Sequence, residues 1–236
     1  VLAGAALLVV TLWGARPGSP RRLSTVSWAV GLLTVMTIGA PWLGSDIGGT
    51  LSMVPALGVA LLLLSGRRIT VRAVTLLGAV TASFLALAIG IEALRPAEDR
   101  THIGRFFLGA ADGGGFFATV SRKWSVNISL LTSSRWAWLL AIIGLFALVV
   151  LVGLGGWRRF ISGRRHEVAA VVSLLTVTAL GWATNDSGTV AAALTLSFFG
   201  PLIATVALRG DVEGQHWLPA LEEADNSLDH VQEAPA

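Results

Sequence analysis

The sequence contains no cysteine, so disulfide bonds, thiol catalysis, iron–sulfur clusters and cysteine-bound zinc are all excluded. Charge is also scarce: only 13% of the 236 residues are charged, whereas soluble proteins have about a quarter. Apolar residues make up 54% of the chain. This composition is typical of a protein that is surrounded by lipid rather than by water.

Signature motifs of the common soluble enzymes are missing as well. The sequence has no G-x-S-x-G elbow, phosphate-binding loop, H-E-x-x-H zinc motif or dinucleotide fingerprint. The spacing of Glu98, Asp99, His102 and Asp112 matches no familiar set of metal ligands. Therefore no metal or other cofactor is implied, and no catalytic residue is assigned.

What the sequence does have is a series of long apolar runs, and four of them (73–91, 136–154, 168–184 and 189–208) are both uncharged and long enough to cross a bilayer. About 20 apolar residues in a helix cross a bilayer core, and an irregular backbone in lipid would leave its amides unpaired. We therefore predict an all-α, polytopic helical membrane bundle with about seven spans, the first of them truncated. The predicted spans are residues 1–14, 25–42, 50–65, 73–91, 136–154, 168–184 and 189–208.

The loops between these spans alternate between arginine clusters and glycine-rich or acidic segments. Eleven of the seventeen basic residues lie on one side, which the positive-inside rule makes cytoplasmic, with the N-terminus outside and the C-terminus inside. The other six lie in the segment 92–135 and oppose this orientation, but the short loops carry more weight. Because the arginines lie at span ends, they indicate no nucleic-acid partner.

Two regions follow from this topology. Residues 1–208 form the predicted transmembrane domain in the plasma membrane, and its segment 92–135 lies at the outer interface. Within that segment, apolar residues of 113–131 recur at helical spacing, which predicts either a helix in the head-group plane or a helix that covers the bundle. Residues 209–236 are rich in acids and form a predicted disordered cytoplasmic tail.

Two short outer turns, GSDIGG (44–49) and NDSG (185–188), supply candidate functional residues. Each precedes a span that contains a proline, so the acids Asp46 and Asp186 are candidates to line a polar path in a transporter or lipid flippase. Asn185, in the same turn as Asp186, is a further candidate functional position. The alternative is that the acids cap the helices that follow. Capping is favoured, because both acids lie at span ends rather than in mid-membrane.

A third candidate is RPAEDRTHIGRF (95–106). Arg100, His102 and Arg105 offer cationic donors and an imidazole, which would suit a membrane enzyme that acts on phospholipids or glycolipids. The favoured alternative is a solvated turn with surface ion pairs.

Four motifs together suggest a relationship: GSDIGGTLSMVP (44–55), RPAEDRTHIGRF (95–106), SRKWSVN (121–127) and NDSG (185–188). In this order they resemble a group of actinobacterial and related Gram-positive multi-span membrane proteins. In that group, a similar membrane region follows an extracytoplasmic domain of the alkaline phosphatase type, whose nucleophile and metal ligands have no counterpart here. The resemblance implies a bacterial cell-envelope setting. We expect a non-catalytic module that anchors or positions envelope machinery, with the lipid bilayer and an extracytoplasmic domain or envelope protein as partners.

Overall fold

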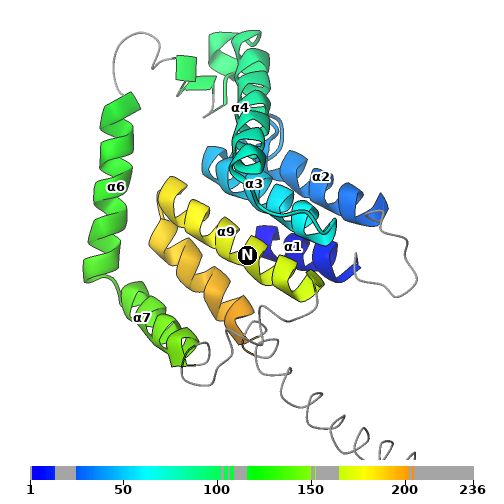
Figure 1. Ribbon diagram of the computed structural model, residues 1–236. Coiled ribbons are helices and arrows are strands. Elements are labelled where there is room, and N and C mark those ends of the chain that lie inside the picture. Colours follow the sequence, from blue (N-terminus) through cyan, green and yellow to red (C-terminus); the bar gives the residue numbers. More distant parts are fainter. Residues whose placement is uncertain are drawn as a thin grey trace, which may run out of the picture.

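The computed structural model describes residues 2–13, 25–101, 104–105, 107–108, 116–149, 152, 165–201 and 204. Every regular element within these ranges is helical, which confirms the predicted all-α class (Figure 1). The elements are α1 (Leu2–Trp13), α2 (Thr25–Gly39), α3 (Ile47–Leu64), α4 (Val71–Ala93), the 3-10 turn η1 (Ala97–Asp99), α6 (Phe116–Ser133), α7 (Arg135–Leu148), α9 (Arg165–Thr184) and a last helix, Gly188–Pro201.

Helix α3 lies at the centre of the bundle. It packs against α9 most extensively and also contacts α1, α2 and α4, while α1 contacts α9 as well (Figure 1). Its buried side chains are small or apolar, so neighbouring helices approach it closely. The core cluster consists of Ala6, Leu7, Val10, Val35, Met53, Val54, Ala56, Leu57, Ala60, Leu61 and Val177.

Side-chain caps begin the two helices that flank the arginine loop 65–70. Asp46 caps α3, since its Oδ1 accepts a hydrogen bond from the backbone N–H of Gly49 at 2.9 Å. Thr70 caps α4 in the same way, with its Oγ1 3.2 Å from the amide nitrogen of Ala73. Each cap satisfies one of the amides that the first turn of a helix leaves without a partner.

Three helices are long and apolar enough to cross a membrane: α3, α4 and the part His166–Thr184 of α9. Helices α6 and α7 make a fourth candidate if they count as one span, although they are bent by 73°. Helices α1, α2 and Gly188–Pro201 are apolar but shorter. With 15 residues, α2 rises about 22 Å, whereas a bilayer core is about 30 Å thick. A helical membrane protein is thus supported, and seven crossings stay a prediction.

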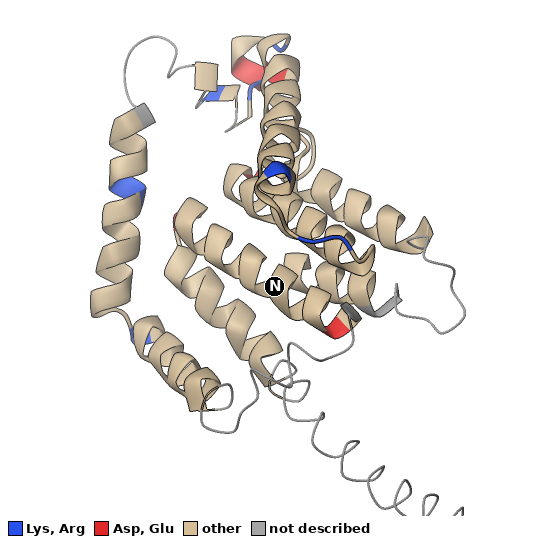
Figure 2. Ribbon diagram, viewed as in Figure 1, with Lys and Arg blue, Asp and Glu red and all other residues tan. Residues whose placement is uncertain are grey.

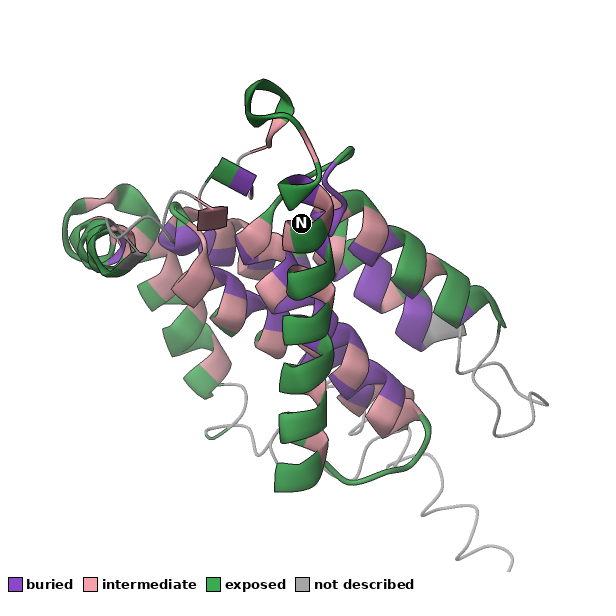
Figure 3. Cartoon of the chain, turned by 90° about the horizontal axis from the view of Figure 1, so that it is seen from above, coloured by how far each residue is buried: buried purple, intermediate pink, exposed green. Residues whose placement is uncertain are grey.

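The helices at the periphery of the bundle, α4 and α7, expose apolar surface. Helix α4 buries only Thr81, Ala88 and Glu92, and α7 buries none of its described residues (Figure 3). Charge is absent along most of their length and gathers toward helix ends and loops (Figure 2). Water is a poor solvent for such surfaces, whereas lipid tails cover them at no cost in hydrogen bonding. The exposed faces of α4 and α7 therefore fit a lipid environment.

Candidate functional site

Three motifs that are far apart in the sequence meet at one point of the structure. The side chain of Asn127 in α6 is buried, and its Nδ2 donates hydrogen bonds to the backbone carbonyl oxygens of Trp182 and Asn185, both at 3.0 Å. Thr189 in turn donates from its Oγ1 to the backbone carbonyl of Asn127 at 3.3 Å. We call these four residues the Asn127 junction. This junction joins α6 to the turn between α9 and the last helix.

The same turn is also tied to the first turn of α3. Thr184 donates from its Oγ1 to the carbonyl oxygen of Gly48 at 3.1 Å. Gly48 has no room for a side chain, because a β-carbon there would overlap Oδ1 of Asn185. Glycine in the motif 44–49 therefore serves a close approach between two turns, and the motifs at 44–49, 121–127 and 185–188 form one continuous contact.

Two further contacts hold α6 against the end of α9. The Nζ of Lys123 lies 3.0 Å from Oδ1 of Asp186. The ring of Trp124 meets the ring of Trp182 edge to face, with 5.7 Å between their centroids. Asp186 is therefore the counter-ion of the sole lysine, and 71% of its side chain is exposed. This ion pair was not predicted from the sequence.

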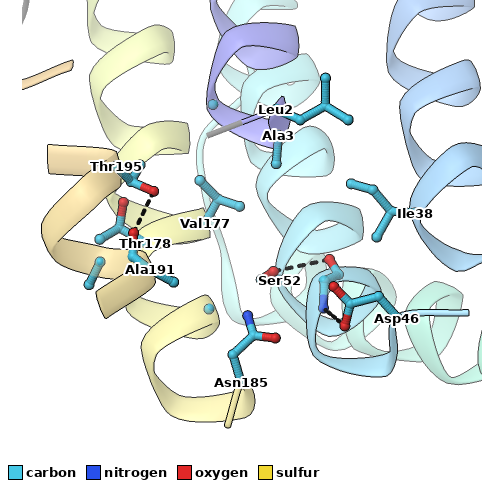
Figure 4. Close-up of a pocket in the computed structure, with 14 residues that line it drawn as sticks. Leu2, Ala3, Ile38, Asp46, Ser52, Val177, Thr178, Asn185, Ala191 and Thr195 are labelled. Carbon is cyan, nitrogen blue, oxygen red and sulfur yellow. Dashed lines mark hydrogen bonds between the residues drawn. The ribbon is translucent and has the colours of Figure 1, made fainter. Parts of the chain in front are cut away.

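A cavity of about 220 Å³ with mixed polar and apolar walls lies between α1, α2, α3, α9 and the last helix (Figure 4). Asp46 and Asn185 both line it, on either side of Ser52, so the structure brings these two candidate residues together. Asp186 is not among its lining residues. Asp46 combines both predicted roles, since the residue that faces the cavity is also the cap of α3.

The hydroxyl groups around this cavity are already engaged within their own helices. Ser52 donates to the carbonyl of Gly49 at 3.0 Å, and Thr178 and Thr195 each donate to the carbonyl four residues earlier. The carboxylate of Asp46 and the amide of Asn185 are thus the polar groups best placed to contact a guest.

A second cavity, of about 540 Å³, lies on the other side of the junction. Its walls come from the first turns of α3, from α4 and α6, and from the end of α9. Most of its lining side chains are apolar. Lys123 is the single charged residue among the described residues that line it.

Residues 95–101 fold over the end of α4 around one buried carboxylate. Glu92 is fully buried, its Oε1 lies 3.1 Å from Nη1 of Arg95, and its Oε2 accepts a hydrogen bond from the backbone N–H of Thr101 at 2.6 Å. A β-carbon at Gly104 would overlap the same carboxylate. Sequence reasoning missed Glu92, although an acid that ends a long uncharged run and precedes an arginine by three residues was a usable signal.

The cationic cluster predicted on this segment is not assembled in the described residues. Arg100 turns back on its own loop and donates from Nε to the carbonyl of Arg95 at 3.3 Å, and Arg105 is exposed. Neither arginine lines the two cavities. His102 lies outside the described residues, as do Asp112 and the tail 209–236.

Neither a metal site in the described part of the chain nor a known relative indicates what the site binds. Within the described ranges, no three histidine, aspartate or glutamate side chains gather in a way that would hold a metal ion. No protein-family model matches this sequence, and neither a curated protein nor a solved structure is significantly similar to it.

Proposed function

We propose that this chain is a non-catalytic membrane module of the bacterial cell envelope that anchors or positions envelope machinery. The observation that carries the proposal is the Asn127 junction. A buried amide that donates to two carbonyls of another helix hairpin holds α6 in one orientation. The outward surface of α6 therefore keeps a constant position relative to the bundle, as an attachment surface requires.

The use of the charged residues supports the same proposal. Asp46 caps α3, Asp186 pairs with Lys123, and Glu92 closes the loop after α4. These carboxylates stabilise local structure, as carboxylates do at helix ends and in ion pairs.

A transporter or lipid flippase is the second candidate, and the 220 Å³ cavity that Asp46 and Asn185 line is the observation in its favour. The cavity volume argues against large cargo. Its 220 Å³ is below the roughly 300–1,000 Å³ of pockets that hold small molecules. The cavity suits a few water molecules or a small ion better than a lipid head group, so the anchoring proposal is preferred.

The two candidates can be separated with the purified chain in vesicles. We expect neither movement of fluorescent lipid between leaflets nor ion flux above that of protein-free vesicles. In cells that lack the protein, Thr195→Leu, which fills the 220 Å³ cavity, should reverse the envelope defect that the loss causes, whereas Asn127→Ala, which releases α6, should not. The opposite pattern, with flux that Thr195→Leu abolishes, would replace the anchor with a transporter.

The predicted orientation has its own test, because a chain without cysteine permits single-cysteine labelling. In intact cells, a membrane-impermeant maleimide should label Ser187→Cys in the turn after α9. It should label Arg68→Cys, in the loop between α3 and α4, only after permeabilisation. Labelling of Arg68→Cys alone in intact cells would invert the topology.

A further inference from the structure

The 540 Å³ cavity lies where the outer ends of several helices converge. Ile47 and Leu51 from the beginning of α3 form one wall, and Val120 and Trp124 of α6 form another. By the predicted topology these residues belong to the outer leaflet, near the level of the head groups. The volume falls within the roughly 300–1,000 Å³ of pockets that enclose small ligands.

The chemistry of the walls selects an amphiphilic guest. The apolar side chains offer no hydrogen bonds to a polar solute, so they favour an aliphatic chain. Lys123 adds one cation to the wall, and its side chain is 30% exposed. A guest that satisfies both features has a long apolar part and an anionic group close to it.

A competing anion can replace Asp186 as the partner of Lys123. Asp186 approaches it from the exposed side, with 71% of its own side chain in contact with solvent. Exposed ion pairs contribute little to stability, since water competes for both charges. A phosphate delivered by a bound molecule can therefore take the place of the carboxylate, and charge-assisted hydrogen bonds to phosphate are among the stronger ones.

We propose that this cavity binds one acyl chain of an anionic phospholipid, and that the lipid phosphate replaces Asp186 as the partner of Lys123. This site goes beyond the anchoring function and does not depend on it. The choice of a phospholipid follows from the two features together. Free phosphate would leave the apolar walls in contact with water, and a zwitterionic lipid would bring a cationic group close to Lys123.

The test uses the full chain in detergent and native mass spectrometry with phosphatidylglycerol, phosphatidylcholine and inorganic phosphate as probes. We expect one phosphatidylglycerol per chain, bound about fivefold more tightly than phosphatidylcholine. Both lipids offer a phosphate to Lys123, but Lys123 repels the choline cation of phosphatidylcholine, and an exposed charge interaction is worth up to about that factor. Inorganic phosphate should show no saturable binding. Val120→Trp should remove the binding of both lipids, because the indole occupies the space of the acyl chain.

Two variants of the ion pair distinguish ligand binding from a structural role. Lys123→Gln should weaken the binding of phosphatidylglycerol about tenfold, because the phosphate loses its charged partner. It should weaken the binding of phosphatidylcholine less, because the substitution also removes the repulsion of the choline cation. Asp186→Asn should strengthen the binding of phosphatidylglycerol about two- to fivefold, because it removes an exposed ion pair of that strength that competes with the lipid for Lys123. Arg122→Gln is the matched control: it removes the same charge from the neighbouring position of α6, which does not line the cavity. It should change the affinity by less than twofold.

Three results would overturn the proposal. If Lys123→Gln and Asp186→Asn both weaken the binding of phosphatidylglycerol, then the ion pair only holds α6 in place. If Arg122→Gln weakens binding as much as Lys123→Gln does, then the lipid is held by general surface charge. If Val120→Trp binds both lipids as the native chain does, then the lipid lies elsewhere. Thermal unfolding of each variant verifies that the compared proteins are folded.

Discussion

Replacing Asn127 with aspartate should detach α6 from the bundle. The Nδ2 of Asn127 donates to two carbonyl oxygens, so a carboxylate there would face two acceptors without a proton to offer. Asn127 is 2% exposed, and an uncompensated charge at such a site costs about 3–5 kcal/mol. Asn127→Ala should cost less, about 2–3 kcal/mol, because it leaves two carbonyls unpaired and adds no charge.

Two measurements test this prediction: thermal unfolding of the whole chain and hydrogen exchange of α6. Thermal unfolding in detergent should rank native, Asn127→Ala and Asn127→Asp in order of falling stability, and hydrogen exchange should rise in α6 while α3 stays protected. Ser125→Ala is the control, since Ser125 is an exposed residue of the same helix. If Asn127→Asp unfolds at the same temperature as Ser125→Ala, then the amide does not hold α6, and the anchoring proposal loses its main support.

Removing the buried carboxylate of Glu92 should release residues 95–101 from the end of α4. Glu92→Ala leaves the guanidinium of Arg95 and the amide of Thr101 without their partner. The loss of one partner of a fully buried pair costs about 3–5 kcal/mol. The side chain of Arg95 is 28% exposed and recovers some hydration, so we expect about 2–3 kcal/mol. Glu92→Gln should cost about 1 kcal/mol, because its carbonyl oxygen still accepts from the Thr101 amide.

Limited proteolysis reports this change directly, since a released loop is cut faster. Cleavage between residues 95 and 105 should accelerate strongly in Glu92→Ala and moderately in Glu92→Gln. Glu98→Gln is the matched control, because Glu98 is an exposed acid of the same segment. Equal cleavage of Glu92→Ala and Glu98→Gln would contradict the role assigned to Glu92.

Local signals made the helices predictable. Each predicted apolar run overlaps a helix of the described structure, and the turn GSDIGG was expected to supply a cap, which Asp46 does. Helical periodicity, capping and the exclusion of charge act within a few residues, so a single segment reveals them. The number of membrane crossings does not follow in the same way, because a 15-residue helix such as α2 is apolar and yet short.

The candidate sites were only partly predictable. Asp46 and Asp186 were the two acids predicted to face a shared cavity. Asp46 lines the cavity, but its neighbour there is Asn185, whereas Asp186 pairs with Lys123. The sequence offers no means of separating two adjacent residues that point to different sides of one turn. That choice depends on which helix packs against the turn.

The sequence by itself indicated a lipid environment and determined the helical class and the positions of the turns. These features follow from side-chain polarity and from interactions between near neighbours. Tertiary structure alone decided which turns meet, as in the hydrogen bonds of Asn127 to carbonyls 55 and 58 residues away. It likewise decided that Glu92 is buried and that Lys123 lines an apolar cavity. Such contacts depend on how whole helices pack, and packing combines many weak contacts that no single segment encodes.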